Sequence, residues 1–400
     1  MEQKSFDFSK EYGIVLEGGG AKGAYQIGVW KALMEYGVKI KAIAGVSVGA
    51  LNGALICMGD YDRAVNLWSN ISYSSIMNVD DDEMDKLMNR NFKDINFQTV
   101  GQRSKKLLSS GGIDVTPLKQ LMEEVVDEKK IKESEIEFII GTFNLSNMKE
   151  IEITAKETED GCLKDYLMAS ASFPLFKSEK FNGKTYIDGG VANNVPIDML
   201  INRGYEDIIV IRIFGVGMEK KIKIPENVNI VSIAPKTQLC NILEFNPKKA
   251  VRNISLGYFD TVRILMPLAG NEYYIDSLRN ERDYLSSLIA LPEEQLKEIL
   301  ITGWQDTVAA GYSITKKCVE DIFPKLAILL KLDRNWNYTN LYYGILEYCA
   351  RRLRIAKYRI YTEQEFCSLL YKMMMAQHQE EENTDFIMEY ALAIISNILA

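Results

Sequence analysis

The sequence predicts an α/β fold with a mostly parallel sheet, followed by a helical C-terminal region. From Tyr12 to about residue 235, short β-branched segments alternate with segments of helical spacing. This alternation is typical of a parallel sheet with helices on its faces. From about residue 247 onward the apolar spacing is helical, and strand-like segments are no longer evident.

Six segments in the first part are expected to be strands, because each is short and mostly apolar, as strands buried on both faces are. They are residues 14–17, 40–44, 137–142, 184–187, 207–213 and 229–233. Helices are expected at residues 24–36, 48–58 and 117–126. The last of these would begin with Thr116 as its N-cap and Pro117 at its first helical position.

A polar stretch between about residues 70 and 112 interrupts this pattern, and we expect a lid or surface excursion over the sheet. Its acidic run, Asp80–Glu83, lacks the glycine and the spacing of a calcium loop, which favours a solvated helix start. Further helices are expected at residues 291–330, 340–359 and 385–400. We therefore expect an α/β domain over residues 10–265 and a helical region of unknown role over residues 266–400.

Composition limits the classes of function. The chain has 400 residues, 47% of them hydrophobic, and a formal net charge of −8, which argues against a nucleic-acid-binding protein. The first residues lack the apolar core of a signal peptide, and no run of 18 apolar residues occurs. Six cysteines are scattered without paired spacing, which favours free thiols. These features predict a soluble, cytoplasmic protein.

The chain contains one histidine, His378. This count excludes zinc sites with several histidine ligands and most acid–base schemes that use an imidazole. His378 lies near the C-terminus at an expected helix end, so we do not expect it to be catalytic.

A glycine-rich loop, Gly18–Gly23, follows the first expected strand. A phosphate-binding P-loop is excluded because Ala24 and Tyr25 stand where Lys-Ser or Lys-Thr would be needed. A dinucleotide-binding loop remains possible by pattern, since Gly18, Gly20 and Gly23 match G-x-G-x-x-G. That interpretation also requires an acidic residue at the end of the second strand.

The second expected strand ends instead in Gly45-Val46-Ser47-Val48-Gly49, which matches G-x-S-x-G. A serine on a sharp turn from strand to helix is exposed at the carboxyl end of the sheet, and small neighbours permit its backbone angles. The glycine loop can then supply the oxyanion hole that a serine nucleophile needs. Its backbone N–H groups, those of Gly19 and Gly20 above all, can hold the oxyanion that forms on an attacked ester, with the amide of Val48 as an additional donor.

With no imidazole at hand, the base must be another group. Asp188 ends an expected strand and is followed by Gly189 and Gly190, which turn the chain sharply. Its carboxylate could contact the serine hydroxyl directly. Taken alone, the Asp-Gly-Gly sequence is more typical of a simple tight turn.

The combination of these blocks resembles the patatin-like phospholipases, most of all their bacterial members. The blocks are Gly18–Gly23, Gly45–Gly49, Ala169–Pro174 and Asp188–Gly190, in the order and at spacings similar to those of the family. The resemblance covers residues 10–265, which makes this segment the expected catalytic domain, and it does not extend to the helical remainder.

The resemblance implies a three-layer α/β/α fold and a Ser-Asp dyad that hydrolyses acyl esters of phospholipids or related lipids through an acyl-enzyme, without metal or other cofactor. Residue by residue, it makes Ser47 the nucleophile and Asp188 the general base. Gly18, Gly19, Gly20 and the turn of Lys22 and Gly23 become the oxyanion loop. Ala169, Ser170 and Pro174 are expected to support the aspartate strand.

A phospholipase must also reach lipid, so we expect a peripheral contact with a membrane surface. Around residues 351–360, Leu353, Ala356 and Ile360 would share one side of a helix with cationic residues around the rest. Such a helix could dock on anionic headgroups or a nucleotide regulator, although a solvated helix packed within its domain is favoured. Two other functions stay open, a dinucleotide-binding module and a catalytically inactive scaffold of the same fold.

Overall fold

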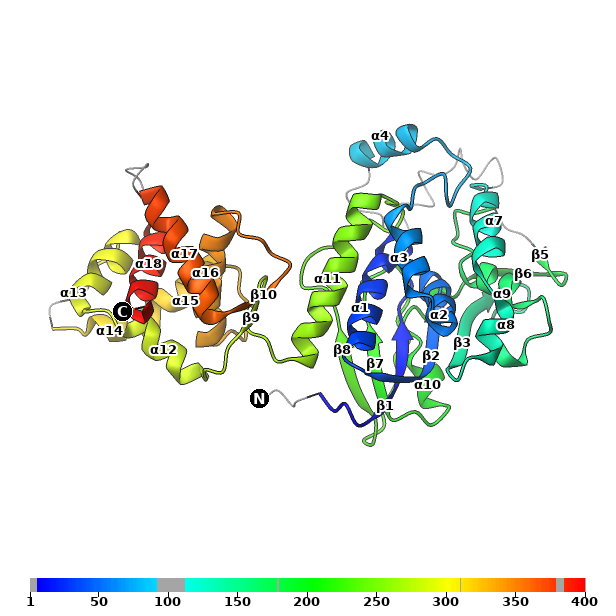
Figure 1. The fold of residues 1–400 in the computed structure, drawn as a ribbon, viewed down its shortest axis with the longest axis horizontal. Coiled ribbons are helices and arrows are strands. Elements are labelled where there is room, and N and C mark those ends of the chain that lie inside the picture. The colour runs from blue at the N-terminus through cyan, green and yellow to red at the C-terminus, as the bar shows by residue number, and fades with distance from the viewer. Residues whose placement is uncertain (1–5, 92–111, 178–179, 310, 379–384, 400) are drawn as a thin grey trace. The chain divides into compact units, whose positions relative to one another are not determined.

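The structure is a computed structural model that describes residues 6–91, 112–177, 180–309, 311–378 and 385–399. The chain divides into two compact units, Ser5–Leu265 and a second one over Met266–Ala400. Figure 1 labels their helices and strands. No helix within the described ranges has both the length and the apolar character needed to cross a membrane.

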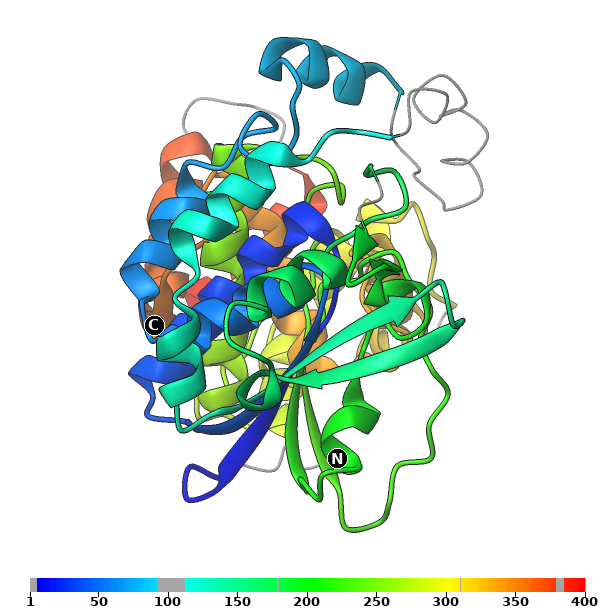
Figure 2. The ribbon, with the colours of Figure 1, turned by 90° about the vertical axis from the view of Figure 1, so that its right-hand side faces the viewer.

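The first unit is built on an eight-stranded sheet with the strand order β5-β6-β3-β2-β1-β7-β8, and β4 pairs with β3. Five strands are parallel: β1 (Glu11–Leu16), β2 (Lys39–Val46), β3 (Glu137–Asn144), β7 (Asp207–Ile211) and β8 (Asn229–Ile233). Strands β4 (Lys149–Thr154) and β6 (Lys184–Asp188) run antiparallel to β3, and β5 (Lys180–Phe181) pairs with β6. Figure 2 shows the long antiparallel hairpin of β3 and β4.

Both faces of the central strands are buried. Along β1, Ile14 and Leu16 belong to the larger core, which they share with residues of α1 (Ala24–Glu35), α2 (Val48–Met58) and α11 (Pro247–Leu265). Val15 points to the other face and packs in a smaller core with Met199 and Leu200 of α10 (Ile197–Ile201). This alternation produces helix, sheet and helix layers, which confirms the predicted fold class.

The remaining helices of this unit are α3 (Tyr61–Ser69), α4 (Asp81–Asn91), α7 (Thr116–Val125), α8 (Glu128–Glu133) and α9 (Leu163–Ser170), with short 3₁₀ turns at Gly20–Gly23, Ala155–Glu157 and Gly189–Val191. Part of the predicted lid, residues 92–111, lies outside the described residues. The predicted N-cap of α7 is wrong by one residue, because the N-cap is Val115. Thr116 is already helical, and the side chain of Asp114 accepts a hydrogen bond from its backbone N–H at 2.9 Å.

The second unit contains the helices α12 (Glu281–Ile289), α13 (Glu293–Leu296), α14 (Ile314–Lys317), α15 (Phe323–Leu329), α16 (Tyr338–Arg352), α17 (Glu363–His378) and α18 (Phe386–Leu399), with π-helical segments at Lys297–Ile301 and Cys318–Ile322. It also contains two strands that the sequence pattern did not indicate. β9 (Tyr274–Asp276) and β10 (Ile360–Thr362) pair in parallel, which corrects the expectation that strands end before residue 247.

The expected amphipathic helix at residues 351–360 is not formed. Helix α16 ends at Arg352, Leu353 is its C-cap, and Arg354 has a φ of 55°, which breaks the helical path. Ile360 then begins β10. Leu353, Ala356 and Ile360 therefore share no helical face, and the docking role considered for that helix has no structural basis.

Candidate active site

The neighbouring parallel strands β1, β2 and β7 end at one edge of the sheet, and β1 and β2 lead there into the predicted glycine loop and Ser47. Leu16 at the end of β1 lies opposite Gly45 in β2 and opposite Ile211 in β7. The glycine loop, Ser47 and the segment after Ile211 therefore start side by side at the carboxyl ends of their strands. Ligands bind at this edge in open α/β sheets.

Ser47 stands on the sharp turn that the motif predicts. Its φ is 54° and its ψ is −131°, and helix α2 begins at the next residue. A side chain on Gly49 would place its Cβ 2.3 Å from the carbonyl oxygen of Leu16, and one on Gly45 would lie 2.6 Å from the backbone of Gly49. Only glycine fits at both positions, because strand and helix approach so closely around the serine.

A buried serine holds the turn in place. The backbone N–H of Ser47 donates to the hydroxyl of Ser170 at 2.9 Å, and that hydroxyl donates to the carbonyl of Gly141 at 2.6 Å. The sequence assigned Ser170 to the support of the aspartate strand. In the structure that task falls to the carbonyl of Ser172, which accepts from the backbone N–H of Asp188 at 2.9 Å.

Asp188 ends β6 and is buried, with 5% of its surface exposed. Its carboxylate forms a hydrogen bond with the side chain of Ser47 and accepts one from the backbone N–H of Gly190 at 2.8 Å. Burial raises the pKa of Asp188 to about 6, against the opposing effect of these two hydrogen bonds. The carboxylate is therefore a stronger base than an ordinary aspartate and is still mostly ionised at neutral pH.

The glycine loop packs tightly against its surroundings and leaves amides free. Gly20 has a φ of 54°, and a Cβ there would lie 2.1 Å from the carbonyl oxygen of Ile242. That same oxygen accepts a hydrogen bond from the N–H of Ala21 at 2.8 Å. Within the described part of the chain, no acceptor contacts the amides of Gly19, Gly20 or Val48.

Asn194, which the sequence analysis did not single out, joins the glycine loop to the aspartate turn. Its side-chain amide donates to the carbonyl of Gly18 at 3.1 Å, and its own carbonyl accepts from the N–H of Gly18 at 3.2 Å. A Cβ on Gly190 would lie 2.4 Å from its side-chain oxygen. Side chains on two other predicted glycines would also clash, Gly189 against the carbonyl of Gly141 and Gly23 against the side chain of Val48.

Lys22 is a predicted site residue that does not line the pocket around Ser47. Its ammonium group donates to the carbonyl of Phe214. His378 is the last residue of α17 in the second unit, and its side chain is outside the described residues.

An apolar pocket opens on Ser47 and Asp188, and the sequence analysis did not identify its walls. They come from α3 and the residues after it, from α7, and from the segment before α11. The apolar lining includes Leu67, Trp68, Ile71, Ile76, Leu118, Leu121, Met122, Val125, Phe173, Phe176, Val216, Ile242, Leu243 and Phe245. Asp188 is the one charged side chain among the lining residues that the structure describes.

Asn52 ties this wall to the glycine loop. Its side-chain nitrogen donates to the carbonyl of Gly23 at 3.0 Å and to the side chain of Gln26 at 2.8 Å, and its oxygen accepts from the indole of Trp68 at 3.0 Å. Asn52 itself lines the pocket and is buried. The spacing of G-x-S-x-G indicated the helix that carries Asn52 but gave no sign of these partners.

Comparisons with known proteins give the family. Residues 14–201 match the sequence model of the patatin-like phospholipases. A protein of Invertebrate iridescent virus 6 named "Probable lipid hydrolase 463L" is 27% identical over 202 residues, which are 49% of this chain and 66% of the viral protein. The lysophospholipase NTE1 of Cryptococcus neoformans is 26% identical over 209 residues, which are 52% of this chain and 11% of the fungal protein.

The chain thus spans only part of each of these relatives. The crystal structure of VipD from Legionella pneumophila aligns with 97% of this chain and 84% of its own, at 14% identity and a TM-score of 0.40. The family match covers the end of β1, the glycine loop, Ser47 and Asp188 together. Residues 14–201, just under half of the chain, are therefore identified as a patatin-like phospholipase domain.

Proposed function

We propose that this chain is a lipid acyl hydrolase, of phospholipase A or lysophospholipase type, in which Ser47 and Asp188 form the catalytic dyad. The observation that carries the proposal is the hydrogen bond between the Ser47 side chain and a buried carboxyl whose pKa is raised to about 6, at the polar end of an apolar pocket. The apolar walls suit an acyl chain, and we assign the chemistry to the unit Ser5–Leu265.

In the proposed reaction Asp188 takes the proton of the Ser47 hydroxyl as its oxygen attacks the ester carbonyl carbon. The tetrahedral adduct collapses, the bond to the alcohol breaks, and the alcohol leaves with the proton returned by Asp188. Asp188 then deprotonates a water molecule that attacks the acyl-enzyme. The fatty acid departs as the proton returns to Ser47.

The negative charge of each tetrahedral adduct needs donors, and the unengaged amides of Gly19, Gly20 and Val48 are the candidates. Val48 is the first residue of α2, whose N-terminus also favours negative charge, and Gly19 and Gly20 line the same pocket as Ser47. The other predicted residues of the loop hold its backbone in place. Gly18 and Gly23 do so through their close packing, and Lys22 through its hydrogen bond to the carbonyl of Phe214.

Replacing Gly20 with valine is expected to lower turnover by about 10² to 10³, the cost of losing one oxyanion donor. A side chain there would clash with the carbonyl of Ile242 and disfavour the φ of 54°. Gly37 is a matched control, since its φ of 70° is also positive but nothing lies within 4 Å of its Cβ position. Gly37→Val should keep turnover within about twofold, and equal losses in both variants would contradict a role for the loop.

The dinucleotide-binding alternative fits the structure poorly. In that case the loop amides would face a pyrophosphate, yet the amide of Gly18 bonds to Asn194 and that of Ala21 bonds to Ile242.

Labelling with a fluorophosphonate ester tests the proposal. The reagent phosphonylates activated serines, so we expect one adduct, located by mass spectrometry on the peptide that contains Ser47. Denatured protein is the control, because it retains every hydroxyl but not the site. Native protein that stays unlabelled would contradict the proposal and favour an inactive scaffold or a binding module.

A further inference from the structure

The segment from Phe214 to Ile224, which we call the rim segment, follows β7 and borders the pocket. Val216 lines the pocket, while the side chains of Phe214 and Met218 on either side of it are exposed by 54% and 64%. Ile224 at the end of the segment is exposed by 37%. Large apolar side chains are thus held in solvent at the edge of the pocket that would receive an acyl chain.

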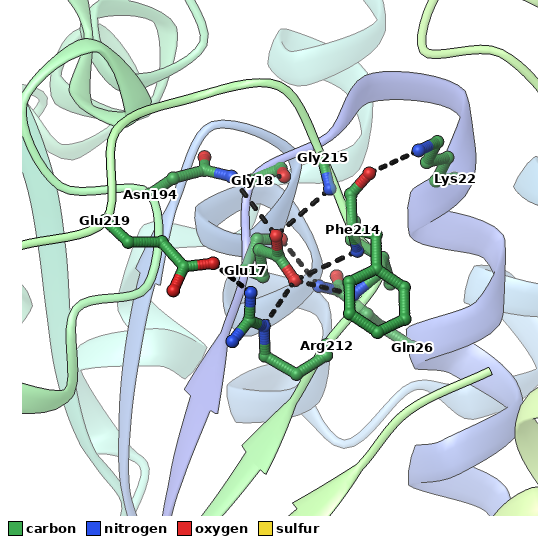
Figure 3. Close-up of polar contacts among 10 residues, drawn as sticks. Glu17, Gly18, Lys22, Gln26, Asn194, Arg212, Phe214, Gly215 and Glu219 are labelled. Atoms are coloured by element: carbon green, nitrogen blue, oxygen red, sulfur yellow. Dashed lines mark hydrogen bonds and ion pairs between the residues drawn. The ribbon is translucent and has the colours of Figure 1, made fainter. Parts of the chain in front are cut away.

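The backbone beneath Phe214 is fixed by the buried carboxylate of Glu17, as Figure 3 shows. This carboxylate accepts hydrogen bonds from the backbone N–H groups of Ile213 at 2.7 Å, Phe214 at 3.1 Å and Gly215 at 3.0 Å, and it pairs with Arg212 at 3.0 Å. Phe214 itself has a φ of 48°, a region that bulky residues rarely adopt. The backbone that carries this exposed ring is therefore fixed, and the guanidinium of Arg212 lies over the ring, 5.6 Å from its centre.

Met218 is fixed as firmly. Its backbone N–H donates to the carbonyl of Gly190 at 2.9 Å, and its carbonyl accepts from Asn194 at 2.6 Å. A Cβ on Gly217 would lie 2.6 Å from both Asn194 and the carbonyl of Gly190. Both exposed side chains thus project from backbone that is bonded to the glycine loop or to the aspartate turn.

Glu219, which pairs with Arg212, follows Met218, and cationic side chains come after it. Lys220 is engaged by Glu150 and Asp198. Lys221 and Lys223 are exposed, and no acidic side chain of the described residues forms an ion pair with them. An apolar tip with adjacent unpaired lysines is complementary to a lipid surface that carries negative headgroups.

We propose that the rim segment docks this protein on anionic lipid surfaces, with Phe214 and Met218 inserted among the acyl chains and Lys221 and Lys223 at the headgroups. This inference rests on the proposed function, because the docked segment would present the pocket to the lipid that it hydrolyses. A lipid molecule could then pass from the surface into the pocket along Val216 without crossing bulk water.

The test is cosedimentation with vesicles of ether-linked phosphatidylcholine and phosphatidylglycerol, which lack ester bonds and so stay intact. The double variant Phe214→Asn/Met218→Gln should bind at least about tenfold more weakly than the wild type, since two buried apolar side chains are lost. Asparagine tolerates the positive φ of Phe214. Met148→Asn is the matched control, because Met148 also has a positive φ of 52° and is 71% exposed but lies in the turn after β3. It should bind as the wild type does.

The variant Lys221→Gln/Lys223→Gln should also bind more weakly, and its binding should depend less on salt and on phosphatidylglycerol content. Unchanged vesicle binding by the Phe214/Met218 variant, or equal loss in Met148→Asn, would overturn the docking proposal. Hydrolysis of a soluble short-chain ester, measured on the same samples, separates the two hypotheses. If the wild type lacks that activity, the proposed function fails, whatever the vesicles show.

Discussion

Asp188→Asn is expected to reduce ester hydrolysis by at least about 10⁴, the scale on which losing a member of a serine hydrolase catalytic group acts. Asparagine has the shape of aspartate and can still accept from Gly190, but it cannot take the proton of Ser47. The sequence offers no imidazole near the motifs to replace it. Turnover of a short-chain p-nitrophenyl ester by wild type and variant measures this loss.

The same substitution should make the fold more stable at neutral pH. The pKa of Asp188 is about 6 in the folded protein and 3.8 for an ordinary aspartate, so the folded state binds more protons between these values. The free energy of unfolding of the wild type therefore falls as pH rises from about 4 to about 6, by about 3 kcal/mol, and stays lower above. The asparagine of the variant does not titrate. Denaturant titrations across this pH range should therefore show that the variant lacks this fall in the free energy of unfolding.

The pH profile of the wild type provides a second measurement. Because the base must be ionised, kcat/KM should decline below an apparent pKa of about 6 rather than below 4. His378→Ala is the control and should keep both the turnover and the profile. If His378→Ala loses as much turnover as Asp188→Asn, the dyad is wrong.

Ser47→Ala is expected to lower the rate of ester hydrolysis by orders of magnitude, as removal of the nucleophile does in other serine hydrolases. Fluorophosphonate labelling should disappear as well. Ser47→Gly should be equally inactive but more stable than Ser47→Ala by about 1 kcal/mol or more, because glycine adopts a φ of 54° without strain. Burst kinetics on a p-nitrophenyl ester and denaturant titration separate these two effects.

Activity of Ser47→Ala within about tenfold of the wild type would remove Ser47 from the mechanism, since chemistry without a nucleophile cannot come that close. Equal stability of the alanine and glycine variants would leave the nucleophile assignment intact. It would show instead that the backbone of the turn carries little strain.

The sequence was most informative where a local pattern determines a local structure. The strands around Ile14, Ile43 and Ile209 were predictable because continuous apolar segments match strands buried on both faces. The turn at Ser47 was predictable because Gly45 and Gly49 have no side chains. Their absence allows the close approach of strand and helix that such a turn requires. Adjacency of Ser47 and Asp188 followed from the resemblance, and both residues line one pocket in the structure.

Features that depend on distant partners could not be predicted in this way. Trp68 and Phe245 line one pocket, yet nothing in the local sequence of either indicates the other. The apolar residues of the segment at 351–360 have helical spacing. The segment is nevertheless not a helix, because Arg354 has a left-handed backbone and Ile360 pairs with Tyr274 in a strand. Three-residue strands such as β9 are too short to show an alternating pattern.

The position of β1 between β2 and β7 has a consequence for synthesis of the chain. On the ribosome β1 and β2 emerge early, but the other edge of β1 must wait for Ile208–Ile211, which pair with Gly13–Leu16. Until then a nascent chain exposes an unpaired apolar strand edge, the kind of surface that associates with other chains. We therefore expect chaperones to bind the nascent chain at β1 until Ile208–Ile211 have emerged.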